Sequence, residues 1–155
     1  MRKIISNSTP LIILSKIGEL KILKNLYGEI IIPQAVFDEV TIKSDTIKNL
    51  SWIKILKVQD KSNRKIYQSK LHDGEVEVMM LAKEISADLL IIDDNAAKKT
   101  AKFLGFTVTG TLGVLLKAKS EKIISEVKPI LEKMLAENFY IGDEIIKLVL
   151  KTARE

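Results

Sequence analysis

The sequence contains no cysteine and only one histidine, His72. Without thiols the chain cannot form disulfides, iron–sulfur clusters, thiolate zinc sites or a cysteine nucleophile. A single imidazole also excludes a metal site built from several histidines, and a serine-histidine-acid triad would have to use that one residue. Because His72 precedes Asp73-Gly74, we interpret it as a loop or helix-cap residue. The remaining metal ligands are carboxylate and amide oxygens, which favour Mg²⁺ or Mn²⁺.

Long hydrophobic runs are also missing. No segment approaches the roughly 18 to 20 apolar residues that a membrane helix needs. The first residues, Met1 to Ile5, lead directly into the polar Ser6-Asn7-Ser8, unlike the apolar core of a signal peptide. We therefore expect a cytoplasmic protein with no membrane segment. At 155 residues, 46% hydrophobic and 29% charged, the composition is typical of one globular domain, residues 1–155.

Aromatic residues make up only 5% of the chain, and acidic residues are fewer than basic ones, which leaves a formal charge of +5. A positive charge is compatible with a polyanionic partner but does not establish one. All of the basic residues except Arg2, Arg64 and Arg154 are Lys, which binds phosphate as a point charge, whereas Arg reads base edges better. With few rings to stack on bases, any nucleic-acid contact should be mostly to the backbone and loosely selective.

Apolar periodicity predicts strands that alternate with helices along the chain. The predicted strands are 3–6, 29–32, 52–58, 88–92 and 106–108, and the predicted helices are 8–18, 19–26, 34–41, 75–85 and 95–104. Two helical stripes follow, one over 124–135 and one over 141–149, while residues 43–72 are the least regular and 59–64 indicate a loop. This alternation predicts an α/β fold with three layers, α/β/α, around a mostly parallel central sheet.

Polar residues follow three of the predicted strands. They are Ser6-Asn7-Ser8, Asp93-Asp94-Asn95 and Thr109-Gly110-Thr111. Open parallel sheets place their sites at the carboxyl ends of strands, so these three turns are candidate site positions.

The neighbouring carboxylates of Asp93 and Asp94 allow two interpretations. Like charges oppose joint ionisation, and a hard divalent cation would remove that conflict. In the alternative, Asp93 caps the following helix and Asp94 lies in its first turn, where the helix dipole favours an anion.

Two glutamates could join such a site. Glu75 opens a helix 18 positions before Asp93, so one short loop can bring both to the same edge of the sheet. A first-turn carboxylate behind Asp73 is the alternative. Glu39 lies three residues after Val36 on a predicted helix and can border its buried side, or it can be a solvated surface acid.

Five segments, taken in order, resemble the PIN domain family. They are 4–12 (IISNSTPLI), 32–40 (IPQAVFDEV), 73–82 (DGEVEVMMLA), 90–98 (LIIDDNAAK) and 110–115 (GTLGVL). Each segment is weak alone, but five in order over nearly the whole chain are specific. The Asp93-Asp94 pair and the Gly110-Thr111-Leu112-Gly113 turn are similar to the short prokaryotic branch that contains VapC-type toxin ribonucleases.

The resemblance implies a ribonuclease that uses Mg²⁺ or Mn²⁺ to cleave single-stranded RNA. Carried over position by position, the metal ligands and catalytic residues would be Asn7, Glu39, Glu75 and Asp93, with Asp94 as a further catalytic residue. PIN domains carry Asp where this chain has Asn7, which keeps a carbonyl oxygen but removes one negative charge. The alternative is therefore a PIN fold that has lost hydrolysis and holds RNA or a protein partner.

The resemblance also implies how substrate and partners would bind. The candidate substrate-binding residues are Ser8, Thr9, Thr109 and Thr111 for the scissile phosphate, and Lys98 and Lys99 beside the RNA strand. For the lysines, a solvated helix face is the simpler interpretation. The expected partners are RNA, a small antitoxin protein and a second copy of the chain in a homodimer.

Overall fold

The computed structural model describes residues 2–62, 64–65 and 71–155. Position 63, in the predicted loop 59–64, lies outside the described residues, as do positions 1 and 66–70. The described strands are β1 (Ile4–Ser6), β2 (Ile30–Pro33), β3 (Ile53–Leu56), β4 (Leu89–Ile91) and β5 (Val108–Thr109). The described helices are α1 (Ser8–Lys16), α2 (Lys21–Tyr27), α3 (Gln34–Lys43), α5 (Asp73–Ile85), α6 (Asn95–Phe103), α7 (Thr111–Ser120), α8 (Lys128–Ala136) and α9 (Asp143–Thr152).

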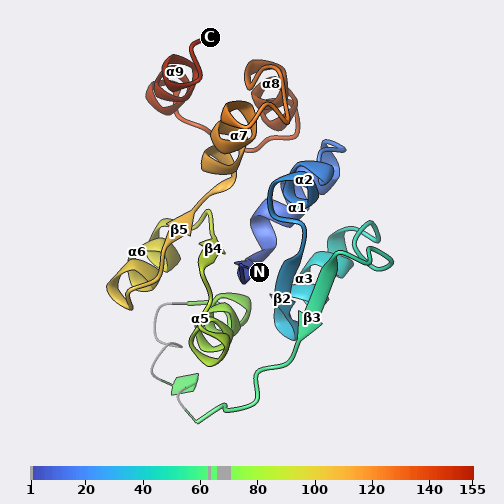
Figure 1. Ribbon diagram of the computed structural model, residues 1–155, viewed down its shortest axis with the longest axis vertical. Helices are drawn as coiled ribbons and strands as arrows, with labels where there is room; N and C mark the ends of the chain where they lie inside the picture. Colours follow the sequence, from blue (N-terminus) through green and yellow to red (C-terminus); the bar gives the residue numbers. More distant parts are fainter. Residues whose placement is uncertain (1, 63, 66–70) are drawn as a thin grey trace.

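The five strands form one sheet in the order β3-β2-β1-β4-β5, and every pair is parallel. The central strand is β1, whose Ile5 lies opposite Ile31 of β2 and Leu90 of β4. Helices flank the sheet on both sides (Figure 1). The predicted three-layer α/β/α fold is therefore confirmed, and the sheet is parallel throughout.

The middle strands are continuous apolar runs, because helices cover both faces of a parallel sheet. Every residue of β1, β2 and β4 is buried. The edge strand β3 differs, since only its first residue, Ile53, is buried. Pro33, which lacks an N–H, is the last residue of β2 and directly precedes α3, so it ends the strand without breaking its hydrogen bonds.

Several predicted elements differ from the structure. The strand predicted over 52–58 is Ile53–Leu56, and the stripe predicted over 124–135 begins before α8 and includes Leu135, which is exposed. The last strand is Val108–Thr109, not 106–108, because Phe106 still donates its N–H to Ala101 of the preceding helix. In α9 the inward-facing residues are Ile146, Val149, Leu150 and Ala153, which are spaced as one helical face. The stripe predicted over 141–149 consists of Ile141, Ile145, Leu148 and Val149. It is wrong at Ile145 and Leu148, whose side chains are exposed.

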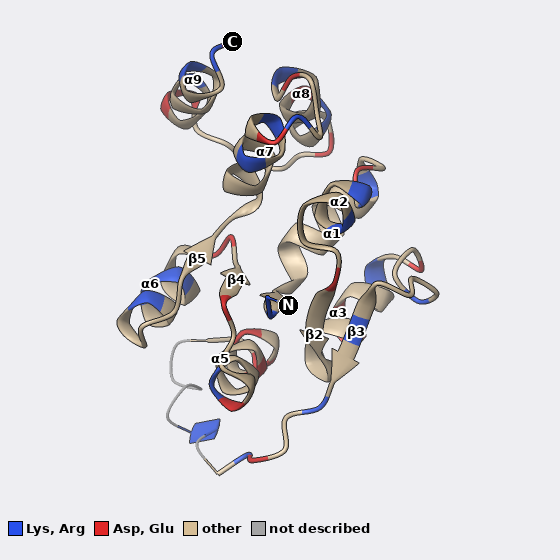
Figure 2. Cartoon of the chain, viewed as in Figure 1, with Lys and Arg blue, Asp and Glu red and all other residues tan. Residues whose placement is uncertain are grey.

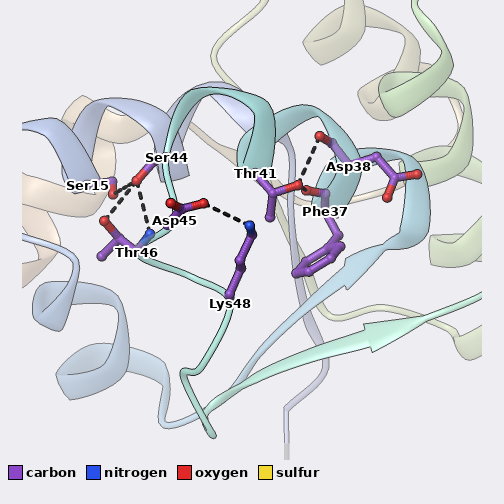
Figure 3. Close-up of polar contacts among 8 residues, drawn as sticks. All are labelled: Ser15, Phe37, Asp38, Thr41, Ser44, Asp45, Thr46 and Lys48. Carbon is purple, nitrogen blue, oxygen red and sulfur yellow. Dashed lines mark hydrogen bonds and ion pairs between the residues drawn. The ribbon is translucent and has the colours of Figure 1, made fainter.

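The segment after α3 is joined to α1 by hydroxyl groups (Figure 3). The Ser15 and Ser44 hydroxyls are 3.0 Å apart, and Ser44 donates to Thr46 at 2.8 Å. An ion pair between Lys48 and Asp45 closes the next turn at 2.8 Å. These contacts hold the irregular segment that leads to β3.

None of the helices in the described ranges combines the length and the apolar character needed to cross a bilayer.

The carboxylate of Glu155 joins three parts of the C-terminal helical layer. It accepts hydrogen bonds from the N–H groups of Val127 and Lys128, at 2.7 and 2.9 Å, and from Lys119 Nζ at 2.9 Å. Burial opposes the ionisation of this carboxyl group, but these hydrogen bonds outweigh it and hold the pKa of Glu155 below its usual value. The ionised form therefore stabilises the start of α8.

We expect Glu155→Gln to lower the free energy of unfolding at pH 7 by about 1–2 kcal/mol, because charge-assisted hydrogen bonds are lost. Since the folded-state pKa lies below the unfolded value of about 4.5, this stabilisation is complete above that pH and is lost as the pH falls through the lowered pKa. Urea unfolding from pH 7 to pH 3 should show the two proteins converging in acid. Glu132→Gln, at an exposed position of α8, is the control. A difference of equal size at pH 3 would contradict the charge mechanism.

Candidate active site

The strands β1 and β4 meet at the point where the chain reverses its direction across the sheet. From β1 the chain moves to β2 and β3, and then returns to β4 on the other side of β1. Such switch points open a crevice at the carboxyl ends of the two strands. The residues there are Asn7 and Asp93, and the Asn7 N–H donates to the Ile91 carbonyl at 2.9 Å. The structure thus places these two predicted site residues at the same edge of adjacent strands.

Asp93 is fixed in place by the first residue of α7. Its Oδ1 accepts from the Thr111 N–H at 2.7 Å, and its Oδ2 accepts from the Thr111 hydroxyl at 2.6 Å. Thr111 is fully buried, so this carboxylate has one well-defined position. Each oxygen keeps a lone pair that can accept a further ligand. The Thr111 hydroxyl, predicted to hold phosphate, donates its hydrogen to Asp93 in this structure.

Asp94 has a different role from its neighbour. It is exposed, and its Oδ2 accepts from the Ala97 N–H at 2.9 Å, which makes it the N-cap of α6. The alternative in which Asp93 caps this helix is therefore wrong, because Asp94 does so. Capping by Asp94 leaves Asp93 free to turn toward Thr111 and the sheet edge.

Glu75 is a buried carboxylate near the start of α5, with 7% of its surface exposed. Its Oε1 accepts from the His72 N–H at 3.0 Å, and His72 is the N-cap residue of α5, as predicted. Within the described part of the chain, Glu75 forms no ion pair. Burying an unpaired carboxylate is unfavourable. The hydrogen bond to His72 is the capping box of α5, so the alternative of a first-turn carboxylate holds for Glu75. It uses only Oε1, and a cation at Oε2 would compensate the charge that has no partner among the described residues.

Gly74, the residue before Glu75, lies beside the start of α1. A Cβ placed on Gly74 would lie 3.7 Å from Asn7 Oδ1 and 3.7 Å from Ser8 Oγ. Asn7 and Ser8 are both buried, and Ser8 Oγ has no hydrogen-bond partner among the described residues. A buried hydroxyl without a partner is unfavourable unless a ligand or water satisfies it. Oxygen donors of Asn7 and Ser8 thus lie beside the residue that precedes Glu75, on this side of the switch point.

Glu39 lies on the exposed side of α3. Val36, one turn earlier, faces inward and packs beside Gly74, with its Cγ2 3.5 Å from the point where a Cβ on Gly74 would be. Across residues 2–62, 64–65 and 71–155, no three acidic or histidine side chains form a group that could hold a metal ion. The structure therefore does not bring Glu39, Glu75 and Asp93 together as one preformed cluster.

The remaining predicted site residues lie around these carboxylates. Thr9 is exposed in α1, and Thr109 makes a long contact of 3.5 Å with the Gly110 carbonyl. A side chain at Gly113 would collide with Thr109 Oγ1, which explains the glycine. Lys98 is half-buried and Lys99 exposed on α6, whose basic residues lie beside the acidic turn after β4 (Figure 2).

One part of the surroundings was not predicted. The segment 139–142, before α9, lines a pocket of about 330 Å³ together with Asp93 and Lys98. It is far from Asp93 in the sequence, and no spacing or motif connects the two. Its only signal is the aromatic pair Phe139-Tyr140 before Gly142, in a chain with few aromatic residues.

Comparison with known proteins identifies the family of the chain. A family model described as PIN domain matches residues 3–155. No curated protein matches the chain. The match covers all five strands and all the site residues described above, so the chain belongs to the PIN domain family.

Proposed function

We propose that this protein is a divalent-metal-dependent ribonuclease that cleaves single-stranded RNA. The observation that carries the proposal is the buried Glu75 carboxylate, which has no cationic partner among the described residues. It directly follows Gly74, the residue that lies beside Asn7 and Ser8 at the switch point of a PIN domain. A nuclease-type fold with an unpaired acid at its ligand-binding edge favours a metal site over a purely structural role.

The residues present fit a hard cation such as Mg²⁺ or Mn²⁺. All the candidate donors at this edge are oxygens, and no thiolate is present in the sequence. Asn7, Glu75 and Asp93 would hold the ion, and Glu39 would complete the set implied by the family resemblance. When bound, the ion would polarise a phosphodiester and make hydroxide available near neutral pH.

The chain's own residues then have separate roles. Thr111 holds Asp93 in one orientation, and Asp94 fixes the turn by capping α6. The family resemblance assigns the Ser8 hydroxyl to a phosphate oxygen; in this structure the hydroxyl is buried and donates to no described acceptor. Lys98, which forms no ion pair with a described residue, supplies a positive charge on the same side as Asp93.

The resemblance to the short prokaryotic branch supports the finer part of the proposal. According to this finer proposal, the protein acts in the cytoplasm as the toxin of a toxin–antitoxin pair. Its partner is a small antitoxin protein, and it forms a homodimer.

A second candidate is a PIN-fold module that binds RNA or a protein without cleaving it. Two observations favour it, namely Asn7 in place of an acid and the lack of a preformed group of three acids in the described chain.

Restoring the acid distinguishes the two functions. We expect Asn7→Asp to raise Mn²⁺ affinity about tenfold or more and to increase cleavage, because it adds a charge to the proposed set of metal ligands. Calorimetry would measure binding, and a labelled single-stranded RNA with Mn²⁺ or EDTA would measure cleavage. Asn25→Asp, which adds the same charge at an exposed position of α2 outside the pocket beside Asp93, is the control.

Cleavage by the native chain that EDTA abolishes would support the ribonuclease. Cleavage by Asn7→Asp alone would instead establish the binding module. Inactivity of both proteins in Mn²⁺ would overturn the assignment of this edge as a nuclease site.

A further inference from the structure

The pocket beside Asp93 has walls of opposite character. One wall comes from the turn after β4 and the start of α6, and the other from residues 139–145. Gly110 and Gly113 form part of the floor. In Figure 1, α6 lies beside β5 and α9 beside α7, and β5 and α7 are the elements on either side of Gly110.

The first wall is charged. Asp93 Oδ1 and Lys98 Nζ each lie 2.8 Å from the point where a Cβ on Gly110 would be. Any side chain at position 110 would displace one of them, and Asp93 cannot move without breaking its bonds to Thr111. Gly110 therefore keeps open a space between a carboxylate oxygen and an ammonium group. Neither group forms an ion pair with any described residue.

The second wall is aromatic and aliphatic. Tyr140 is 91% exposed, and Ile145 is 47% exposed, although both are large side chains. Phe139 and Ile141, the neighbours of Tyr140 in the sequence, pack against the core. An exposed ring beside a cationic group is the combination that single-stranded nucleic acids require, with a stacking surface for a base and a positive charge for the phosphate.

We propose that this pocket binds one nucleotide of the RNA next to the bond that is cut, with Lys98 at its phosphate and Tyr140 stacked on its base. The inference rests on the proposed function, because it takes single-stranded RNA as the substrate. The volume of about 330 Å³ is at the small end of the range for ligand pockets, which suits one nucleotide and excludes a duplex.

A bound nucleotide accounts for both the charged wall and the apolar wall of the pocket, whereas a contact between two copies of the chain accounts only for the apolar wall. A second copy could cover the apolar Tyr140, Ile145 and Leu148, all of which are exposed. It would also have to cover Asp93 and Lys98, whose charges favour a polar ligand at the other end of the pocket. A nucleotide offers its phosphate to Lys98 and its base to Tyr140, so it fits both walls of the pocket.

The test measures RNA binding in EDTA, where metal-dependent cleavage cannot occur. The probe is a fluorescein-labelled single-stranded RNA of mixed sequence, followed by anisotropy. We expect Tyr140→Ala to weaken binding roughly five- to a hundredfold, the usual range for one stacked base. Tyr140→Phe should keep the native affinity because it keeps the ring. Phe103→Ala removes a ring that is 89% exposed but does not line the pocket, and should have no effect.

A second set of probes separates stacking from other roles of the ring. The same RNA with one abasic position, moved along the strand, should lose its sensitivity to Tyr140→Ala when the missing base is the stacked one. Tyr140 is exposed, so Tyr140→Ala should melt at the native temperature.

Unchanged affinity in Tyr140→Ala would overturn the proposal, whether or not the native chain cleaves RNA. A shift from dimer to monomer in light scattering, with unchanged affinity per chain, would also overturn it and would assign the surface to contact between copies. Binding that depends on Tyr140 in a chain that never cleaves would uphold the nucleotide pocket and reject only the ribonuclease.

Discussion

If the proposed function holds, Asp93→Asn should reduce cleavage of single-stranded RNA by roughly a hundredfold or more, because it removes the charge of a proposed metal ligand at the sheet edge. The structure explains why the effect would be chemical and not a consequence of unfolding. The Asn oxygen can still accept from the Thr111 N–H, and its amide group can donate to the Thr111 hydroxyl oxygen. A labelled RNA with Mn²⁺ would measure the rate, and thermal melting would check the fold.

Asp94→Asn is the matched control for this prediction. It removes the same charge one residue later, but Asn is as good an N-cap as Asp, so α6 should keep its start. We expect its cleavage rate to stay within a few-fold of the native value. If both variants lose activity equally, the pair acts through its total charge, and Asp93 has no special role.

Glu75→Gln should make the metal-free protein more stable and remove its response to metal. The substitution is nearly isosteric and keeps an acceptor for the His72 N–H, but it neutralises a buried charge that lacks a partner in the described chain. Neutralising such a group stabilises a protein by about 1–3 kcal/mol, a rise of roughly 2–10 °C in melting temperature for a chain of this size. Conversely, Mn²⁺ should raise the melting temperature of the native chain but not that of the variant.

Glu77→Gln provides the comparison two residues along the same helix. Glu77 has partners, since its Oε1 accepts from the Ala35 N–H at 3.0 Å and its Oε2 lies 3.5 Å from Arg64. Its neutral variant should therefore be less stable with or without metal, and should respond to Mn²⁺ as the native chain does. A destabilised Glu75→Gln in EDTA would mean that its charge is already compensated, and would remove the main argument for a cation.

The parts of the site that could be predicted are those fixed by strand ends. Asn7 and Asp93 follow apolar runs that could only be central strands, and parallel strands end at one edge. Glu75 followed from the helix that begins after His72. Glu39 shows the limit of this reasoning, because an acid next to a buried position of a helix can face solvent, as it does here.

The unpredicted parts depend on contacts between distant segments. Nothing near Thr111 in the sequence indicates that its hydroxyl would hold Asp93, since that contact requires β4 and α7 to meet across β5. The inward face of α9 could not be predicted for a related reason. Both candidate faces contain apolar residues, and only packing against α7 decides that Ile146 and Val149 turn inward while Ile145 and Leu148 do not.

The pairing of β1 with β4 also determines when the site can form. Ile4 lies opposite Leu89, so the two strands that carry Asn7 and Asp93 join residues from opposite ends of a long stretch of chain. Such distant contacts form late in folding, after the entropy of closing the intervening loop has been overcome. Asp93 then needs Thr111 to fix its carboxylate. A chain whose α7 has not yet emerged from the ribosome therefore cannot form the contact that fixes Asp93, and its candidate site is incomplete.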